Sequence, residues 1–187
     1  NDGSVIVYNG EIYNYIELRA QLEAAGRSVA GGSDTGVLIE ALSLWGVPVL
    51  ERLNGMWAFG LWDAPRRRLL LSRDRFGVKP LYFRQGPGGF AFASEPKSLL
   101  ALFPGHRAVN RTALLRFLAH NELHSHDESF YTGIHVLPPA HCAVYEPDSD
   151  RLTVSRYWQY PEQVDPPGDP VEACARFAEL FDDAVRL

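Results

Sequence analysis

A hairpin that is apolar on both faces constrains the fold of this chain more than any other feature. Residues 55–74 read GMWAFGLWDAPRRRLLLSRD. A strand over 57–63 alternates two sets of mostly apolar side chains, Asp-Ala-Pro supplies a turn, and a second strand returns over 69–72. Because strands that are apolar on both faces must be covered on both sides, we predict a layered structure with this hairpin in an inner layer.

Further strands and helices follow from hydrophobic periodicity and from capping residues. Ser33-Asp34 and Asn110 are typical N-terminal caps, while Gly26 and Gly46 are typical helix stops. Together the elements predict a mixed α+β domain with antiparallel strands, extending to about residue 158. The other expected strands are 5–8, 81–83, 90–93, 141–145 and 152–157, and the expected helices are 15–25, 35–45, 112–118 and 171–185.

A proline-rich stretch separates this domain from the last helix. Residues 160–170 read YPEQVDPPGDP, and proline fixes φ and removes backbone donors, which favours an extended connector. We therefore divide the chain into a domain over 1–158, a linker over 159–170, and a segment over 171–187 that begins another unit.

Composition excludes several classes of function. The 187 residues are 46% hydrophobic and carry a net charge of −5, which argues against binding of nucleic acid. The basic run Arg66-Arg67-Arg68 is typical of a solvated hairpin tip. No apolar run approaches the roughly 18 residues that a membrane span needs. Two cysteines indicate a reducing compartment, so a cytoplasmic location is expected.

Most familiar catalytic patterns are missing from the sequence, which has no phosphate-binding loop, zinc motif or Gly-x-Ser-x-Gly elbow. His120, His124 and His126 fall in an expected loop without a periodic scaffold, so we predict no metal site there. Cys142 lies in a strand pattern and reads as a core residue, with His141 on the opposite face. Residues and spacing therefore reveal no nucleophile, and predict no metal or cofactor site.

One short segment remains a candidate for chemistry. Asn9-Gly10 follows the first expected strand, where a side-chain amide and a glycine N–H can converge as an oxyanion hole. Glu11 and Asp34 are anionic groups able to hold an ammonium. The alternative is that Asn-Gly is merely a turn, because this dipeptide is common in turns.

Several blocks then resemble one family, in the same order along the chain. They are YNGEIYNYIELR, GSDTGVLIEAL, LNGMWAFGLWD, SRDRFGVKPLYF, FASEPKSLL, VLPPAHCAVYE and RYW. Over essentially its whole length the chain resembles glutamine-hydrolysing asparagine synthases, whose amidotransferase domain is of class II, with an N-terminal nucleophile. The resemblance implies an αββα sandwich of stacked antiparallel sheets, here in part, followed by a linker and the first helix of a synthetase domain.

The resemblance also implies an activity. In that family an N-terminal cysteine attacks glutamine, using its own α-amino group as base, and releases glutamate and ammonia. A C-terminal domain uses ATP and Mg²⁺ to activate aspartate, which ammonia converts to asparagine. Glutamine, aspartate and ATP are thus the implied small-molecule partners. Dimerisation is common in the family, so a homodimer is one expectation.

Four residues take site roles by this resemblance. The Asn9 side-chain amide and the Gly10 N–H match the oxyanion hole, Glu11 lies with them in the glutamine pocket, and Asp34 matches the acid that binds the glutamine α-ammonium. The chain departs from the family pattern at Gly36, where an acidic residue is usual. This departure removes a negative charge near the expected site.

Other matched blocks are expected to be framework. Arg73 and Asp74, with Gly77 and Pro80, are expected to fix a turn, and the two charged residues are expected to form a structural ion pair. Met56, Trp57 and Phe59 are assigned to the core between the sheets.

The resemblance also suggests an internal fragment, inactive by itself. The family's nucleophile and its carboxylate-binding arginine are expected upstream of the first residue of this chain. The family's ATP-binding loop is expected downstream of the last residue. Three alternatives stay open. One is a relative with an inactive glutaminase site, such as a β-lactam synthetase or a peptide cyclase. Another is an amidotransferase with a different acceptor, and the third is a freestanding binding module.

Overall fold

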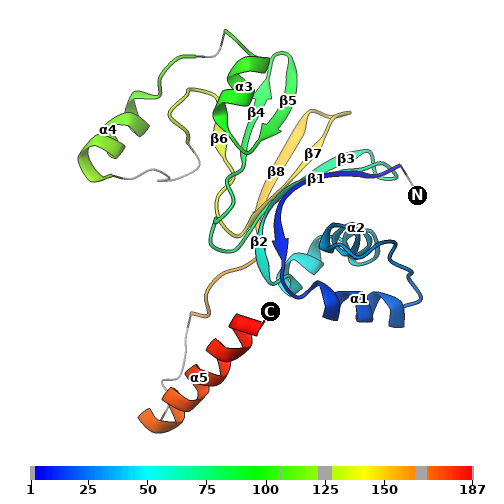
Figure 1. Cartoon of the computed structure of the whole chain (residues 1–187). Helices are drawn as coiled ribbons and strands as arrows, with labels where there is room; N and C mark the ends of the chain where they lie inside the picture. The colour runs from blue at the N-terminus through cyan, green and yellow to red at the C-terminus, as the bar shows by residue number, and fades with distance from the viewer. Residues whose placement is uncertain (1–2, 106, 122–127, 163–167, 187) are drawn as a thin grey trace.

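The strands form two antiparallel sheets that stack between helices (Figure 1). This computed structural model describes residues 3–105, 107–121, 128–162 and 168–186. The five-stranded sheet has the order β1-β2-β3-β7-β8, and the three-stranded sheet has the order β5-β4-β6. The strands are β1 (Val5–Ile12), β2 (Gly55–Asp63), β3 (Arg68–Arg73), β4 (Tyr82–Gly86), β5 (Gly89–Ala93), β6 (His135–Val136), β7 (His141–Glu146) and β8 (Arg151–Arg156).

Helices cover the outer faces of both sheets. Helices α1 and α2 lie against the five-stranded sheet at β1, and α3 packs on β4 and β5 of the smaller sheet. The expected four-layer αββα arrangement of an N-terminal-nucleophile amidotransferase is therefore confirmed. The helices are α1 (Tyr15–Ala24), α2 (Asp34–Trp45), α3 (Pro96–Leu102), α4 (Arg111–His120) and α5 (Pro170–Arg186), with a 3₁₀ helix over Val47–Arg52.

Local signals in the sequence predicted the main helix ends. Ser33 caps α2 by accepting a hydrogen bond from the Gly36 N–H, and Asn110 caps α4 by accepting one from the Ala113 N–H. Helix α3, the 3₁₀ helix and β6 were not predicted. Each is short, so hydrophobic periodicity has little length in which to show.

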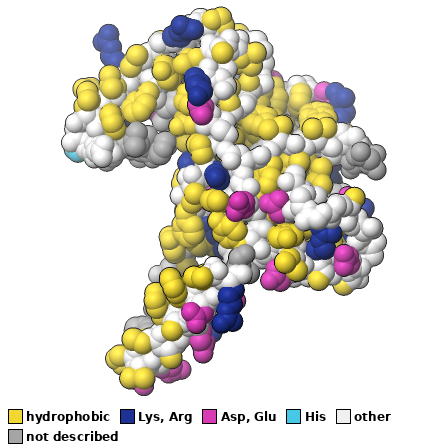
Figure 2. All heavy atoms as spheres, viewed as in Figure 1, with side chains coloured by type: hydrophobic (Ala, Val, Ile, Leu, Met, Phe, Trp, Pro, Cys, Tyr) yellow, Lys and Arg dark blue, Asp and Glu magenta, His cyan; other side chains and the backbone are white. Residues whose placement is uncertain are grey.

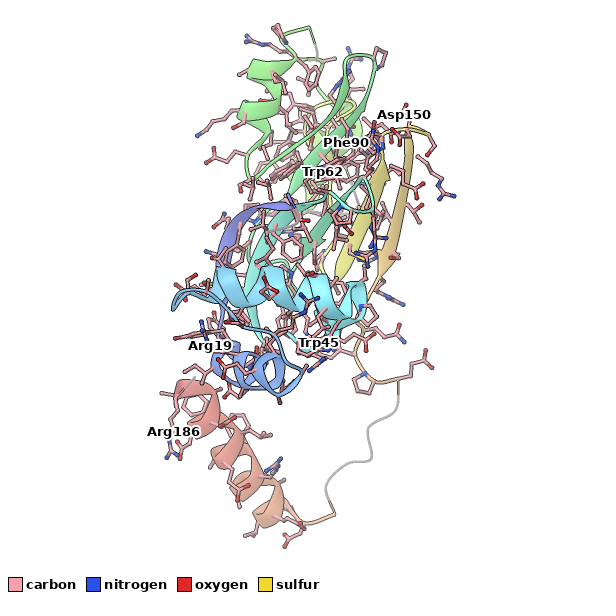
Figure 3. The ribbon with its side chains drawn as sticks, turned by 90° about the vertical axis from the view of Figure 1, so that its right-hand side faces the viewer. Arg19, Trp45, Trp62, Phe90, Asp150 and Arg186 are labelled. Atoms are coloured by element: carbon pink, nitrogen blue, oxygen red, sulfur yellow. The ribbon has the colours of Figure 1, made fainter. Side chains whose placement is uncertain are left out.

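The two faces of the hairpin β2–β3 pack into different layers. Trp57 and Phe59 are buried with the helices, whereas Ala58 and Leu71 are buried toward the smaller sheet. The assignment of Trp57 and Phe59 to the core between the sheets was therefore wrong. Alternation along a strand separates two faces, but it does not say which layer each face meets. Figure 3 shows Trp62 of β2 near Phe90 of β5, where the two sheets meet.

Strand β1 continues through the segment that was expected to turn. Asn9, Gly10 and Glu11 are paired with β2, in register with Ala58, Trp57 and Met56 respectively. The expected turn at Asn9-Gly10 is thus wrong, because the strand runs on to Ile12. The alternation along β1 also leaves the Val5 and Val7 side chains exposed, although an apolar strand is usually buried.

Gly10 allows the backbones of β1 and β2 to approach closely. A Cβ atom at this position would lie 2.1 Å from the Met56 carbonyl oxygen and 2.7 Å from the Trp57 Cα. Gly55 has the reciprocal contact, since its Cβ would lie 2.1 Å from the Glu11 carbonyl oxygen. Glycine is therefore required at both positions because the two backbones lie so close together, and not because the chain turns there.

The chain leaves the larger sheet after β3, builds the smaller sheet, and returns at β7. Asp74, at the exit, is fully buried. Its carboxylate accepts four backbone N–H groups at 3.0–3.2 Å, and its own carbonyl accepts the N–H of Ala140, just before β7. The four donors are Trp57, Phe76, Val78 and Lys79.

Arg73 binds backbone carbonyls, whereas Asp74 binds backbone N–H groups. Its guanidinium donates to the carbonyls of Gly77, Lys79 and Leu137 at 2.8–2.9 Å. Burial lowers the pKa of Arg73, and the nearby Asp74 partly offsets this effect. Although the turn was predicted correctly, the expected Arg73–Asp74 ion pair is wrong: the two side chains bond to backbone groups instead of to each other.

Helix α5 buries none of its side chains among the described residues. Hydrophobic side chains are spread along it in Figure 2, and Val171, Phe177 and Val185 are each at least 70% exposed. The expected division of the chain near residues 159–170 stays a prediction.

We expect Asp74→Ala to destabilise the protein strongly. Removing the carboxylate leaves four buried N–H groups without their acceptor, which costs on the order of 3 kcal/mol or more. Urea unfolding followed by tryptophan fluorescence measures this loss. The matched control is Asp148→Ala, which removes an exposed carboxylate paired with Arg67 and should leave the unfolding midpoint nearly unchanged. Equal effects of the two substitutions would contradict the assigned role of Asp74.

We expect Gly10→Ala to destabilise the protein because the new methyl group overlaps the Met56 carbonyl. The strands must separate locally, at a cost of about 2 kcal/mol or more. Gly32→Ala is the control, since a Cβ there meets nothing within 4 Å. A melting temperature for Gly10→Ala within error of the Gly32→Ala value would show that β1 and β2 do not approach as described.

Candidate functional site

The candidate site lies on the C-terminal half of β1. Tyr8 and Ile12 are more buried than Asn9 and Glu11, which are exposed and alternate with them along the strand. One face of β1 therefore meets the helix layer, and the other faces the space between the sheets. The two predicted side chains Asn9 and Glu11 share the second face.

Asn9 is held from the smaller sheet. Its Nδ2 donates a hydrogen bond to the Ser94 Oγ at 3.3 Å, just after β5. No other described residue accepts a hydrogen bond from this amide, so its second N–H can donate to a ligand. Ser94 was not predicted as a site residue, although it lies within the block FASEPKSLL; its position opposite Asn9 depends on the stacking of the two sheets.

A cavity of about 220 Å³ adjoins Asn9 between the sheets. Its apolar lining includes Val7, Leu81 and Phe92, and its polar lining includes Asn9 and Ser94. A small ligand with a methylene chain and one amide or carboxyl group suits such a lining, because apolar walls accept the chain and the amide dipole meets the polar end.

Asp34 reaches β1 from the helix layer. It is the first residue of α2, and its Oδ2 accepts hydrogen bonds from the Tyr8 hydroxyl at 2.8 Å and from the Ile12 N–H at 3.0 Å. Asp34 is thus fixed to residues on both sides of the segment 9–11. Burial and the Asp34 carboxylate together raise the pKa of Tyr8 above its usual range. Tyr8 is a second residue that sequence reasoning missed, since an aromatic residue in a strand is typical of packing.

The structure brings the predicted residues together on and beside β1. The side chains of Asn9 and Asp34 are bonded to different layers of the fold. Asn9, Gly10 and Glu11 are consecutive on β1, and Asp34 is bonded to Tyr8 and Ile12 beside them. Gly36, the departure noted in the sequence, donates its N–H to the capping Ser33 and lies in the first turn of α2.

The cysteines and histidines do not join this site. Cys142 is buried, its thiol lies 3.3 Å from the Ser155 hydroxyl, and burial raises the pKa of that thiol. Cys174 is exposed on α5. His120 ends α4, whereas His124 and His126 lie outside the described residues. Within the described part of the chain, no group of three metal-ligating side chains is found.

None of the helices in the described ranges is both long and apolar enough to cross a bilayer.

Comparisons with known proteins agree on one family. The model of the glutamine amidotransferase domain matches residues 1–158. Asparagine synthetase [glutamine-hydrolyzing] 3 of Bacillus subtilis is 35% identical over 98% of this chain, which spans 30% of that protein. Amidase chyE of Penicillium rubens is 32% identical over 84% of the chain, which spans 23% of that protein.

A solved structure supports the fold. Glutamine phosphoribosylpyrophosphate amidotransferase from B. subtilis, determined with ADP and GMP, superposes with a TM-score of 0.57 at 18% identity, covering 83% of this chain and 29% of that one. The stacked sheets agree with the family match over residues 1–158. This chain belongs to the glutamine amidotransferase domain family.

Proposed function

We propose that this chain is the glutamine-hydrolysing part of a glutamine-dependent asparagine synthetase. The observation that carries the proposal is the placement of the Asn9 amide beside an inter-sheet cavity, with the Asp34 carboxylate fixed to the same strand. The neutral Asn9 amide suits the side-chain amide of glutamine, and the Asp34 carboxylate suits its α-ammonium. The amide end needs hydrogen-bond donors, and the α-ammonium needs an anion.

The proposed reaction is hydrolysis of the glutamine side-chain amide to glutamate and ammonia. Attack on the amide carbon places negative charge on its oxygen, and the Asn9 Nδ2–H and Gly10 N–H donate to that oxyanion. Asp34 holds the α-ammonium by charge, and Glu11 adds a second negative group on the cavity side of β1. Neutral donors at the oxyanion stabilise the transition state more than the uncharged amide, and this difference accelerates the reaction.

The proposal needs a nucleophile that is neither of the two cysteines in this sequence. The Cys142 thiol is buried, and its raised pKa disfavours the reactive thiolate. Cys174 lies on α5, beyond the amidotransferase match. By family resemblance the nucleophile is an N-terminal cysteine of the mature protein, acting with its α-amino group as base.

Ammonia is proposed to amidate aspartate, with ATP and Mg²⁺ supplying activation of the acceptor carboxylate. The support is that the 35% identical relative is an asparagine synthetase [glutamine-hydrolyzing], of which this chain spans 30%. Within the described residues no group of three candidate metal ligands is found, and the sequence contains no phosphate-binding loop motif. Those steps are accordingly assigned to a synthetase portion outside the amidotransferase match.

We also propose a cytoplasmic enzyme that forms a homodimer. The location is supported by two cysteines that are both free thiols, as expected in a reducing compartment. The homodimer rests on the family resemblance alone.

We expect Asn9→Ala to lower kcat for glutamine hydrolysis by about 10²- to 10³-fold, because one oxyanion donor is lost. Ammonia release from glutamine, measured in the protein as its gene encodes it, tests this expectation. Asn54→Ala is the matched control. It changes the other Asn-Gly pair, in which Asn54 lies just before β2 and makes its hydrogen bonds through its backbone.

The comparison of variants decides between the open alternatives. Loss of activity in Asn9→Ala, with activity kept in Asn54→Ala, supports a working oxyanion hole. No glutamine hydrolysis by the unaltered protein would mean an inactive glutaminase site. Hydrolysis that ATP and aspartate do not couple to asparagine formation would point to a different acceptor.

A further inference from the structure

The Asp34 carboxylate has an unequal set of partners. Its Oδ2 accepts both the Tyr8 hydroxyl at 2.8 Å and the Ile12 N–H at 3.0 Å. Among the described residues, its Oδ1 has one long contact, from the Thr35 hydroxyl at 3.4 Å. One oxygen is therefore bound tightly to β1, and the other keeps most of its capacity to accept hydrogen bonds.

Two donors are needed to keep one oxygen of the Asp34 carboxylate on β1 and the other oxygen turned away from it. The terminal torsion of an aspartate side chain is broad, so a single donor lets the two oxygens exchange or the plane rotate. The Ile12 N–H comes from the backbone and cannot be removed by a side-chain change. The Tyr8 hydroxyl supplies the second direction and fixes which oxygen remains available.

The chemistry of the donor also matters. A lysine or arginine in place of Tyr8 would neutralise Asp34, whereas a neutral hydroxyl orients the carboxylate and leaves its negative charge in place. Among the described residues Asp34 forms no ion pair. A tyrosine hydroxyl is protonated at neutral pH and can donate, and burial and Asp34 raise the pKa of Tyr8 further.

We propose that Tyr8 is a positioning residue that orients Asp34, so that the free Oδ1 receives the α-ammonium of glutamine. This inference rests on the proposed function. It gives the strand a double role: Tyr8 acts on the ammonium end through the helix-facing side, and the adjacent Asn9 meets the amide end on the opposite side.

The test compares glutamine with its desamino analogue, glutaramate, which has the same amide and carboxylate but no α-ammonium. In Tyr8→Phe, measured in the full-length protein, we expect the KM for glutamine to rise about tenfold, with kcat changed less than about twofold. Hydrolysis of glutaramate should be nearly unaffected. The preference for glutamine over glutaramate in kcat/KM should thus fall about tenfold.

Tyr157→Phe is the matched control. Tyr157 packs against the same core cluster, and its hydroxyl donates to the Arg73 carbonyl at 2.8 Å, so the substitution removes a similar hydrogen bond elsewhere. It should leave the preference between the two substrates unchanged, whatever its effect on stability.

Three results would overturn the inference. An equal loss of activity toward glutamine and glutaramate in Tyr8→Phe would show a merely structural role. A preference shifted as much by Tyr157→Phe would show the same, and an unaltered preference in Tyr8→Phe would show that Asp34 needs no such support. If the unaltered protein hydrolyses no glutamine, the proposed function fails and this inference falls with it; activity without a change in preference removes the inference alone.

Discussion

The buried pair of Arg73 and Asp74 ties together the two ends of the excursion that builds the smaller sheet. Asp74 gathers N–H groups from β2 and from the loop that leaves β3, and its carbonyl accepts the N–H of Ala140 at the return. Arg73 gathers carbonyls from the same loop and from Leu137. Since both charges are satisfied by backbone groups, the exit and the return of the chain are fixed to the same point of β2.

That point supports the candidate site. Asp74 bonds to the Trp57 N–H, and Trp57 lies opposite Gly10 in the register of β1 and β2. The aromatic ring of Tyr157 stacks on Trp57 with centroids 6.2 Å apart, which adds packing behind the same residue. The strand that carries Asn9 and Gly10 is therefore backed by a well-packed neighbour, as the proposed oxyanion hole requires of its donors.

The sequence predicted the helices and strands better than it predicted how they pack against one another. The hairpin of β2 and β3 and the caps Ser33 and Asn110 follow from local patterns, because their stabilising contacts lie within a few residues. The layer met by Trp57 depends on which sheet face the helices cover. Likewise, Asn-Gly reads as a turn locally, but close approach of β2 keeps Gly10 in a strand.

The contacts to Asn9 and Asp34 could not be predicted from the sequence because their partners lie far away along the chain. Ser94 is 85 residues away from Asn9, and Tyr8 is 26 residues away from Asp34. Asn9, Gly10, Glu11 and Asp34 were identified by resemblance, and the structure adds the partners that hold two of them. Arg73 and Asp74 show a different limit of sequence reasoning: neighbouring opposite charges suggest an ion pair, yet each side chain bonds to backbone groups.

A structure of the protein with bound glutamine tests the central claim most directly. The account predicts the γ-amide oxygen of glutamine within about 2.7–3.1 Å of the Asn9 Nδ2 and the Gly10 nitrogen. It predicts the α-ammonium on the Oδ1 of Asp34, with Tyr8 still bonded to Oδ2. Glutamine bound away from β1, or with its ammonium on another group, would contradict the account.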